Sequence, residues 1–210
     1  EEDGEVEDKS QEVKTIFVWP EGVLNNTELK NLKKYKNLFK KKFSNKHLII
    51  FGLNNTINEK TFNSMAVVNN NLDLIEIYNK NNLVPFGEFL PFEKFLKNLG
   101  MKTITNFYKS YSPGKKRNII NLDKHEFDIS FLPLICYEII YSGKLSKNNN
   151  YDLIINISED GWFGKSVGPH QHFSHSIFRS IEEGKSIVRS TNNGTSALID
   201  PYGQISDISE

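Results

Sequence analysis

The chain has little cysteine, no long apolar run and no excess of either charge. Its one cysteine, Cys136, cannot form an internal disulfide. No apolar run approaches the ~18 residues that a membrane-spanning helix needs, and Glu1 does not begin a signal peptide. The 26 Lys and Arg residues balance 26 Asp and Glu residues. With this balance, no net charge argues for nucleic acid or for a strongly charged partner.

The length of 210 residues suits one domain with a substantial buried core. Residues 1–14 start with a nearly all-acidic run that has no apolar pattern, so we predict a disordered tail there. Residues 15–210 are predicted to form a single folded domain. Because the chain does not start with methionine, we expect it to be a piece of a longer protein.

Short apolar runs bounded by turn residues predict strands, and two stretches have helical spacing. The predicted strands are 15–19, 48–52, 62–68, 72–78, 131–135, 152–156, 186–190 and 195–200. The predicted helices are 27–43, with its N-cap at Asn26-Thr27, and 169–184, and a short helix is expected at 93–99. Residues 103–124 are predicted to be irregular, and turns are expected at 69–71 and 192–194. Strands that alternate with helices and hairpins indicate an α/β or α+β fold.

Cys136 lies at the end of a predicted strand, where a reactive thiol could be presented. A lone cysteine on an apolar strand is more often a core residue, so a catalytic role needs partners elsewhere in the chain. Glu21 and Lys80 each follow a predicted strand directly. A glutamate can take the thiol proton as general base, and an ammonium group can stabilise a thiolate and an oxyanion. Together these three residues supply the minimum for acyl transfer through a thioester.

Two apolar segments and a group of histidines are further candidates for a function. Residues 83–92 combine two prolines and a glycine with many aromatic and aliphatic residues, which is typical of a loop that is anchored by apolar contacts or that offers them to a ligand. Trp162-Phe163 is flanked by glycines, which favours exposure over a place in the core. His170, His172 and His175 lack framing ligands at metal-binding spacing, so we interpret them as polar residues at a helix N-terminus. Asn192-Asn193 is interpreted as turn chemistry.

Several sequence motifs, spread from Val18 to Gln204, resemble those of the nitrilase, or carbon–nitrogen hydrolase, superfamily and in particular the apolipoprotein N-acyltransferases. The resemblance is carried by Val18-Trp19-Pro20-Glu21, Lys80 with the Val84-Pro85-Phe86-Gly87-Glu88 loop, Ile135-Cys136-Tyr137-Glu138, Gly161-Trp162-Phe163-Gly164, Gly168-Pro169-His170-Gln171-His172, Arg189-Ser190-Thr191-Asn192-Asn193-Gly194 and Ile199-Asp200-Pro201-Tyr202-Gly203-Gln204.

The resemblance implies a four-layer αββα sandwich and an acyltransferase at the periplasmic face of the bacterial inner membrane. Such an enzyme moves a fatty acyl chain from a phospholipid onto its cysteine, and then to the free amine of a diacylglyceryl apolipoprotein. It implies the catalytic residues Glu21, Lys80 and Cys136, with Glu88, Glu138 and Tyr137 in supporting positions and Trp162, Phe163 and Phe86 contacting lipid. We expect no cofactor, no metal, no nucleic-acid partner and a monomer.

The chain departs from the family pattern in three respects. The transmembrane helices that accompany this domain in the family are absent from the sequence. Glu159 stands where the family usually has asparagine, and a closing strand of the sheet is expected to be missing after Gln204. Two other functions stay open: a soluble amidase or nitrilase of the same superfamily, and a non-catalytic domain that binds lipid or a protein partner. The apolar segments favour the transferase, because a small polar amide needs no apolar mouth.

Overall fold

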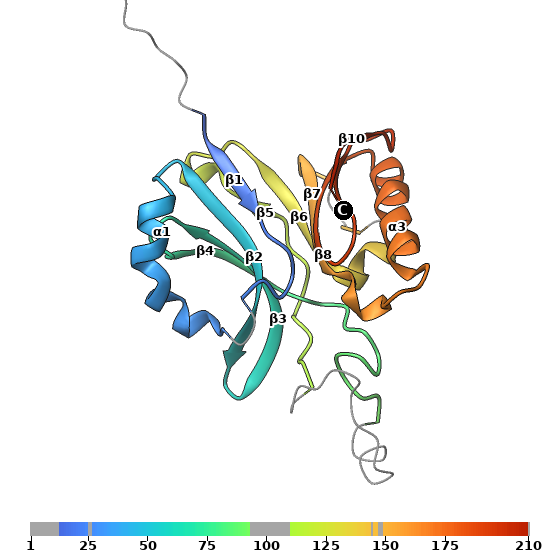
Figure 1. Cartoon of the computed structure of the whole chain (residues 1–210), viewed down its shortest axis with the longest axis horizontal. Coiled ribbons are helices and arrows are strands. Elements are labelled where there is room, and N and C mark those ends of the chain that lie inside the picture. Colours follow the sequence, from blue (N-terminus) through green and yellow to red (C-terminus); the bar gives the residue numbers. More distant parts are fainter. Residues whose placement is uncertain (1–12, 25–26, 93–109, 144, 147–148, 210) are drawn as a thin grey trace, which may run out of the picture.

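Two β-sheets lie face to face in the computed structural model, and each is covered on its outer side by a helix (Figure 1). The structure describes residues 13–24, 27–92, 110–143, 145–146 and 149–209. The resulting order of layers is helix, sheet, sheet, helix, which confirms the predicted αββα sandwich.

The first sheet has the strand order β1-β2-β3-β4. Its strands are β1 (Thr15–Val18), β2 (His47–Ile57), β3 (Lys60–Asn69) and β4 (Leu74–Asn79). The β1 strand runs parallel to β2, whereas β2, β3 and β4 are antiparallel neighbours. The predicted hairpin between the third and fourth strands is confirmed.

The second sheet has the strand order β10-β9-β8-β7-β6-β5. Its strands are β5 (Ile120–Asn121), β6 (Ser130–Ile135), β7 (Leu153–Glu159), β8 (Ser186–Asn192), β9 (Ser196–Ile199) and β10 (Ile205–Ser209). The three central strands, β6, β7 and β8, are parallel. Their carboxyl ends therefore lie at one edge, which is where side chains of α/β folds converge on ligands.

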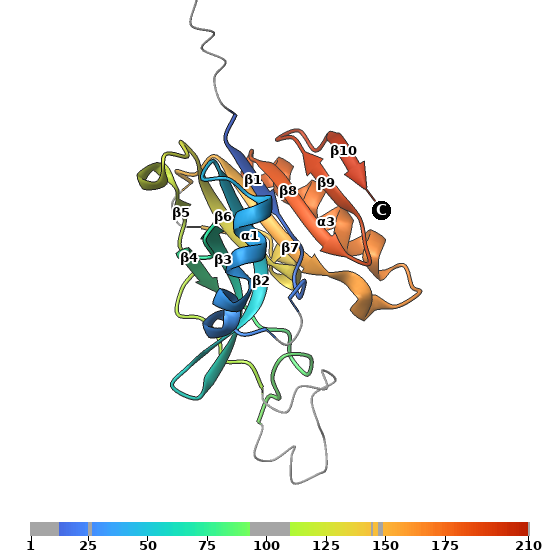
Figure 2. The same cartoon turned by 60° about the vertical axis from the view of Figure 1, so that its left-hand side comes forward.

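Helices cover the outer faces of both sheets (Figures 1 and 2). The first sheet carries the 3-10 helix η1 (Leu29–Tyr35) and α1 (Lys36–Lys42), and the second carries α3 (Gly168–Glu183). Three further short 3-10 helices are η2 (Asp123–His125), η3 (Cys136–Ile140) and η4 (Asp160–Phe163). Among the described residues, no helix is both long and apolar enough to cross a membrane.

The apolar strands are explained by burial on both faces. Leu48 and Ile50 of β2 join the cluster between the two sheets, while Ile49 and Phe51 join the cluster beneath α1. Successive side chains of a strand point to opposite faces, so a strand in an inner layer must be apolar at every position. A third cluster lies between β6–β9 and α3 and includes Leu132, Leu134 and Ile154.

Some predicted elements differ from the observed ones. The helix expected over 27–43 is a 3-10 helix followed by a two-turn α-helix. It starts at Leu29, and Glu28 rather than Thr27 stands at the N-cap position. Part of the stretch predicted as irregular forms η2 and β5. A closing strand was expected to be missing after Gln204, whereas β10 follows there and pairs with β9. The helix expected at 93–99 and most of the acidic tail lie outside the described residues.

Candidate active site

Cys136 sits at a sharp bend where β6 ends and η3 begins. Its φ is +49°, a left-handed backbone conformation that costs a non-glycine residue roughly 1–2 kcal/mol. Glu138 supports the bend, since its Oε2 accepts a hydrogen bond of 2.9 Å from the Ile135 backbone N–H. The bend places the thiol at the carboxyl edge of the central strands, as the sequence predicted.

Glu21 lies in the turn that follows β1 and is held by a neighbouring amide. Its Oε1 accepts a hydrogen bond of 2.6 Å from Asn63 Nδ2, and its Oε2 has no hydrogen-bond partner among the described residues. Gly52 of β2 permits this position, because a Cβ there would lie 2.7 Å from the Glu21 Cα. A carboxylate oxygen with no partner in a buried site is free to accept a proton.

Lys80 follows β4 directly and is 1% exposed. Its Nζ lies 2.9 Å from Glu88 Oε2, so the Val84–Glu88 loop provides a counter-ion to the lysine. Asn63 connects the two carboxylates, since its Nδ2 also donates to Glu88 Oε1 at 2.8 Å. The sequence analysis missed Asn63, although a polar residue in the apolar run of a buried strand was a signal that could have revealed it.

The electrostatics of these groups are coupled. Burial raises the pKa of Glu21, an effect that Lys80 partly offsets. Burial and the Glu21 charge raise the pKa of the Cys136 thiol to about 12, while Lys80 and hydrogen bonds from Ser158 and the Glu159 backbone lower it. The thiol is therefore protonated at rest, and its proton needs a base.

Burial alone would lower the pKa of Lys80, but the charges of Glu21, Glu88, Cys136 and Glu138 outweigh it and raise the pKa. The lysine is therefore a permanent cation at neutral pH. Because the charges of Glu21 and Lys80 both change the pKa of Cys136, the structure brings the three predicted residues into one electrostatic unit.

Comparison with known proteins connects this arrangement with a family. The family model for carbon-nitrogen hydrolases matches residues 25–208. The chain belongs to the carbon-nitrogen hydrolase family.

Curated relatives of this carbon-nitrogen hydrolase carry one name. The chain is 39% identical over 146 residues to an apolipoprotein N-acyltransferase of Bradyrhizobium diazoefficiens, a match that covers 69% of this chain and 27% of the relative. It is 43% identical over 141 residues to an apolipoprotein N-acyltransferase of Rickettsia typhi, with 67% and 27% covered. The matched part thus spans about a quarter of the length of these relatives.

Solved structures share the fold at low sequence identity. An amidase from Nesterenkonia sp. AN1, with the acetamide moiety of fluoroacetamide on its active-site cysteine, superposes with a TM-score of 0.62 at 11% identity, covering 92% of this chain and 72% of the amidase. A glutamine-dependent NAD+ synthetase from Acinetobacter baumannii gives a TM-score of 0.64 at 16% identity, covering 92% and 36%. These structures support the four-layer fold of this chain.

Glu138 is fully buried and holds the loop after Lys80 by hydrogen bonds. Its Oε1 accepts hydrogen bonds from the Tyr78 hydroxyl at 2.7 Å and from the backbone N–H groups of Asn81 and Asn82. The same oxygen pairs with Arg117 Nη2 at 2.9 Å. Arg117 was not predicted, because it comes from a stretch of the sequence with no regular pattern.

The aromatic residues that the sequence associated with lipid are exposed. Trp162 is 56% exposed, Phe86 44% and Phe163 37%. Phe163 also packs on Gly168, where a Cβ would lie 2.6 Å from its ring. Tyr137 is half-buried and meets Tyr141 edge to face beside the thiol.

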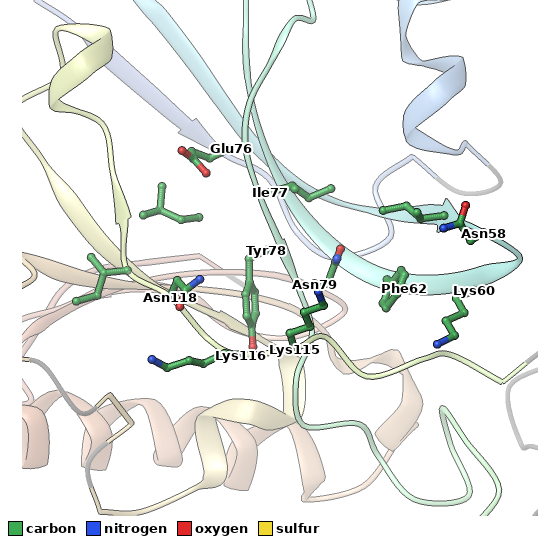
Figure 3. Close-up of a pocket in the computed structure, with 13 residues that line it drawn as sticks. Asn58, Lys60, Phe62, Glu76, Ile77, Tyr78, Asn79, Lys115, Lys116 and Asn118 are labelled. Atoms are coloured by element: carbon green, nitrogen blue, oxygen red, sulfur yellow. The ribbon is translucent and has the colours of Figure 1, made fainter.

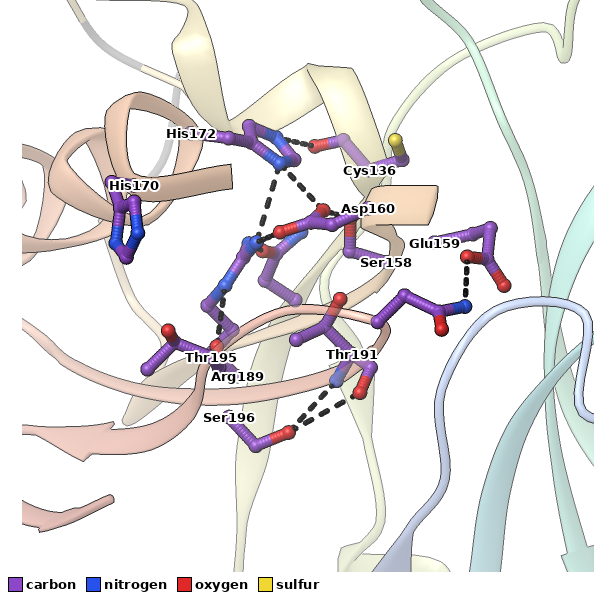
Figure 4. Close-up of polar contacts among 12 residues, drawn as sticks. Cys136, Ser158, Glu159, Asp160, His170, His172, Arg189, Thr191, Thr195 and Ser196 are labelled. Carbon is purple, nitrogen blue, oxygen red and sulfur yellow. Dashed lines mark hydrogen bonds and ion pairs between the residues drawn. The ribbon is translucent and has the colours of Figure 1, made fainter. Parts of the chain in front are cut away.

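The interpretations of His172 and Asn192 from the sequence need correction. His170 is exposed near the helix N-terminus as expected, but His172 is buried and bonded to Asp160 and to the Cys136 carbonyl (Figure 4). Asn192 does more than form a turn, because its Nδ2 donates to the Glu21 carbonyl at 2.8 Å. Local sequence patterns do not show contacts between residues that are far apart in the chain.

Glu159, which departs from the family pattern, makes hydrogen bonds to two neighbouring turns. Its Oε1 accepts hydrogen bonds from the Gly161 N–H at 2.9 Å and from Asn193 Nδ2 at 3.0 Å. Its charge also contributes to the raised pKa of Glu21, although burial is the larger cause. Glu159 thus adds a second carboxylate whose charge acts on Glu21.

A cavity of about 540 Å³ lies away from these residues, against β3, β4 and the segment before β5 (Figure 3). Lys60, Lys115 and Lys116 are among its lining residues, whereas Glu21, Lys80 and Cys136 are not. This cavity is therefore separate from the thiol site.

Proposed function

We propose that the domain formed by residues 15–210 is the catalytic part of an apolipoprotein N-acyltransferase. It transfers a fatty acyl chain from a phospholipid, through a thioester on Cys136, to the N-terminal amine of a diacylglyceryl apolipoprotein. The observation that carries the proposal is the buried unit of Glu21, Lys80 and Cys136. The shared name of relatives 35–43% identical to the chain supports this choice of donor and acceptor.

The first half-reaction forms the acyl-enzyme. Glu21 accepts the thiol proton as the Cys136 sulfur attacks the ester carbonyl of the phospholipid, and the charge that develops on the carbonyl oxygen is stabilised by Lys80. The tetrahedral intermediate then breaks its bond to the glycerol oxygen. Glu21 returns the proton to that oxygen, which leaves a lysophospholipid and an acylated cysteine.

The second half-reaction consumes the thioester. The acceptor's amine attacks the acyl carbonyl, Glu21 takes a proton from the nitrogen, and the sulfur departs and is reprotonated. The products are an amide and the free thiol, so no cofactor is needed at any step. Glu88 keeps Lys80 in place, and Glu138 keeps the following loop in place.

The exposed aromatic residues would receive the acyl chain. Trp162 and Phe163 lie in η4, which follows the strand next to that of the thiol, and Phe86 is in the loop that carries Glu88. Apolar side chains around an acylated cysteine also keep water away, which a transferase requires. We further propose a monomer at the periplasmic face of the bacterial inner membrane, held there by parts of the protein outside this sequence.

The test distinguishes a transferase from an amidase-like hydrolase of the same fold. Full-length enzyme supplied with phospholipid and no acceptor should accumulate an adduct on Cys136 that is heavier by one fatty acyl chain, because water is poorly placed to resolve it. Neutral hydroxylamine should release the adduct, and a peptide with a diacylglyceryl cysteine and a free amine should consume it. Intact-protein mass spectrometry measures both steps.

Cys136→Ala is the control and should carry no adduct. Catalytic release of free fatty acid with no adduct would favour the hydrolase. An adduct of the same size on Cys136→Ala would refute the assignment of the nucleophile.

A further inference from the structure

A cluster of buried charged residues lies directly behind Cys136, outside the unit of Glu21 and Lys80. It consists of Asp160 in η4, His172 in α3 and Arg189 in β8, which are 0%, 3% and 2% exposed. Figure 4 shows the three side chains meeting beside the backbone of Cys136. Charged groups are rarely buried unless they are paired, and here each has a partner.

His172 has a hydrogen-bond acceptor at each ring nitrogen. Its Nδ1 lies 2.8 Å from Asp160 Oδ1, and its Nε2 lies 3.2 Å from the Cys136 carbonyl oxygen. A neutral imidazole carries one N–H, so either neutral tautomer would leave a lone pair facing an acceptor. Both hydrogen bonds can form together when the ring is a doubly protonated imidazolium.

The competing arrangement would have Nδ1 accept a hydrogen bond from Arg189 Nη2, which lies 3.2 Å away. That lone pair would then also face Asp160 Oδ1 at 2.8 Å. Arg189 has a better acceptor in Asp160 Oδ2, at 2.7 Å. Asp160 therefore accepts from both side chains, from His172 through Oδ1 and from Arg189 through Oδ2.

Asp160 is held as a carboxylate that can accept from both side chains. Burial raises its pKa, but hydrogen bonds from His172 and Ser158 and the charge of Arg189 outweigh burial and lower the pKa. In the part of the chain that the structure describes, the polar groups within hydrogen-bond distance of the His172 ring are this carboxylate, the Arg189 guanidinium and the Cys136 carbonyl. The Phe163 ring also packs against His172.

The hydrogen bond to the Cys136 carbonyl matters because the backbone bend at Cys136 is strained. Left-handed backbone at a non-glycine residue persists when surrounding contacts impose it. Glu138 fixes the peptide N–H before the bend, at Ile135, and the His172 Nε2–H fixes the carbonyl of Cys136 itself. With one of these contacts removed, the peptide after Cys136 can rotate and the thiol can turn away from Glu21 and Lys80.

We propose that His172 is a positioning residue of the thiol site: as an imidazolium paired with Asp160, it holds the Cys136 carbonyl and so fixes the direction of the sulfur. Asp160 acts through His172 by accepting the hydrogen of its Nδ1, and Arg189 acts through Asp160, whose other oxygen it binds. The inference rests on Cys136 being the nucleophile of the proposed function. It needs no particular acyl donor or acceptor.

The first test observes the unmodified protein. In full-length protein labelled with ¹⁵N-histidine, solid-state NMR at neutral pH should show both ring nitrogens of His172 with the shift typical of imidazolium. The signal is assigned by its loss in His172→Gln. A neutral ring, with its two nitrogen shifts far apart, would overturn the proposal even if every variant of His172 failed to fold.

The second test compares two substitutions that differ in which hydrogen bond they can keep. The amide of glutamine reaches to about the position of Nε2 and can donate to the Cys136 carbonyl, whereas the amide of asparagine reaches only to that of Nδ1 and can donate to Asp160. Alkylation of Cys136 by iodoacetamide is followed over a range of pH by peptide mass spectrometry, beside the thermal midpoint of unfolding. His170→Asn, exposed on the same helix, is the matched control.

We expect His172→Asn to be alkylated about 10-fold more slowly than wild type at neutral pH, since the thiol loses part of the help of its base. His172→Gln should stay within about 3-fold, and His170→Asn should match wild type. Equal rates in His172→Asn and His172→Gln would reduce His172 to a structural role. Because iodoacetamide replaces both substrates, these results stand even if no acyl adduct forms and the proposed function fails.

Discussion

At the scale of single residues, burial decides how the thiol site behaves. Glu21 in water would be a weak base, but burial raises its pKa and so makes its carboxylate a stronger base. Cys136 with a pKa of about 12 does not exist as a free thiolate at neutral pH. In the mechanism that we propose, the sulfur becomes nucleophilic as Glu21 removes its proton, with Lys80 as the fixed positive charge.

Removing either charge should slow formation of the acyl-enzyme. Glu21→Gln removes the base and Lys80→Met removes the cation, so each variant should acylate Cys136 about 100-fold or more slowly than wild type. Stopped reactions analysed by intact-protein mass spectrometry give the rates. Lys60→Met, in the lysine-lined cavity away from the thiol, is the control for Lys80→Met. Rates within a few-fold of wild type would show that the roles are misassigned.

The amide of Asn63 should set the pH at which the base becomes active. Its hydrogen bond favours ionised Glu21 and so lowers the pKa of that carboxyl. In Asn63→Ala this contribution is lost and the pKa rises further. Because Glu21 must be ionised to accept a proton, the acid limb of the pH–rate profile should move to higher pH.

The acylation rate measured from acid to neutral pH checks the effect of Asn63. Asn55→Ala is a suitable control, since Asn55 is also buried but donates to Asn79 rather than to Glu21. An acid limb that stays in place in Asn63→Ala, or moves to lower pH, would contradict the assignment of Glu21 as the base.

At the scale of elements, the site is assembled by turns that reach across from one sheet to the other. Glu21 follows β1 of the first sheet, yet its backbone carbonyl is held by Asn192 at the end of β8 in the second. The next residue, Asn193, has a φ of +53° and donates to Glu159. The β8–β9 turn therefore connects the backbone of Glu21 with the end of β7.

Loss of the Asn192 contact should reduce the rate more than the stability. One hydrogen bond contributes about 1 kcal/mol, so Asn192→Ala should acylate Cys136 roughly 3- to 10-fold more slowly. We expect little change in the concentration of phospholipid at half-maximal rate, because Asn192 orients the base. Asn193→Gly keeps the left-handed turn but loses the hydrogen bond to Glu159, so it measures that contact separately. An acylation rate in Asn192→Ala equal to that of wild type would show that the contact between the sheets is unimportant.

At the scale of the whole molecule, the apolar layer between the sheets keeps the base and the thiol together. Ile157 of β7 is fully buried in this layer, opposite side chains of β2 and β3. Ile157→Ala should lower the free energy of unfolding by about 2–5 kcal/mol. Ile208→Ala, at a position 51% exposed on β10, should change it by about 0.5 kcal/mol or less. Equilibrium urea denaturation measures both, and equal losses would contradict the two-sheet core.

Much of the fold could be predicted because the strands of the inner layers are apolar at every position. Runs such as residues 48–52 and 131–135 are strongly marked, and α3 was found within a residue of its ends. The edge strands β5 and β10 were missed, since a strand of two residues or one that is exposed throughout carries no apolar pattern.

The sequence by itself determined the chemical groups of the site, because Glu21, Lys80 and Cys136 each follow a strand and share one set of family motifs. The strands that precede these residues, β1, β4 and β6, belong to two different sheets, so the motifs rather than the sheet topology grouped them. The family and the four layers also followed from the sequence, and the comparisons and the structure agree.

The tertiary structure alone decided how these groups are held and charged. The partners of the site come from distant segments: Asn63 from β3, Arg117 from an irregular stretch, His172 from α3 and Asn192 from β8. A hydrogen bond between residues up to 171 positions apart leaves no local pattern in the sequence. Burial, which sets the pKa of Glu21 and Cys136, likewise exists only once both sheets have closed over the site.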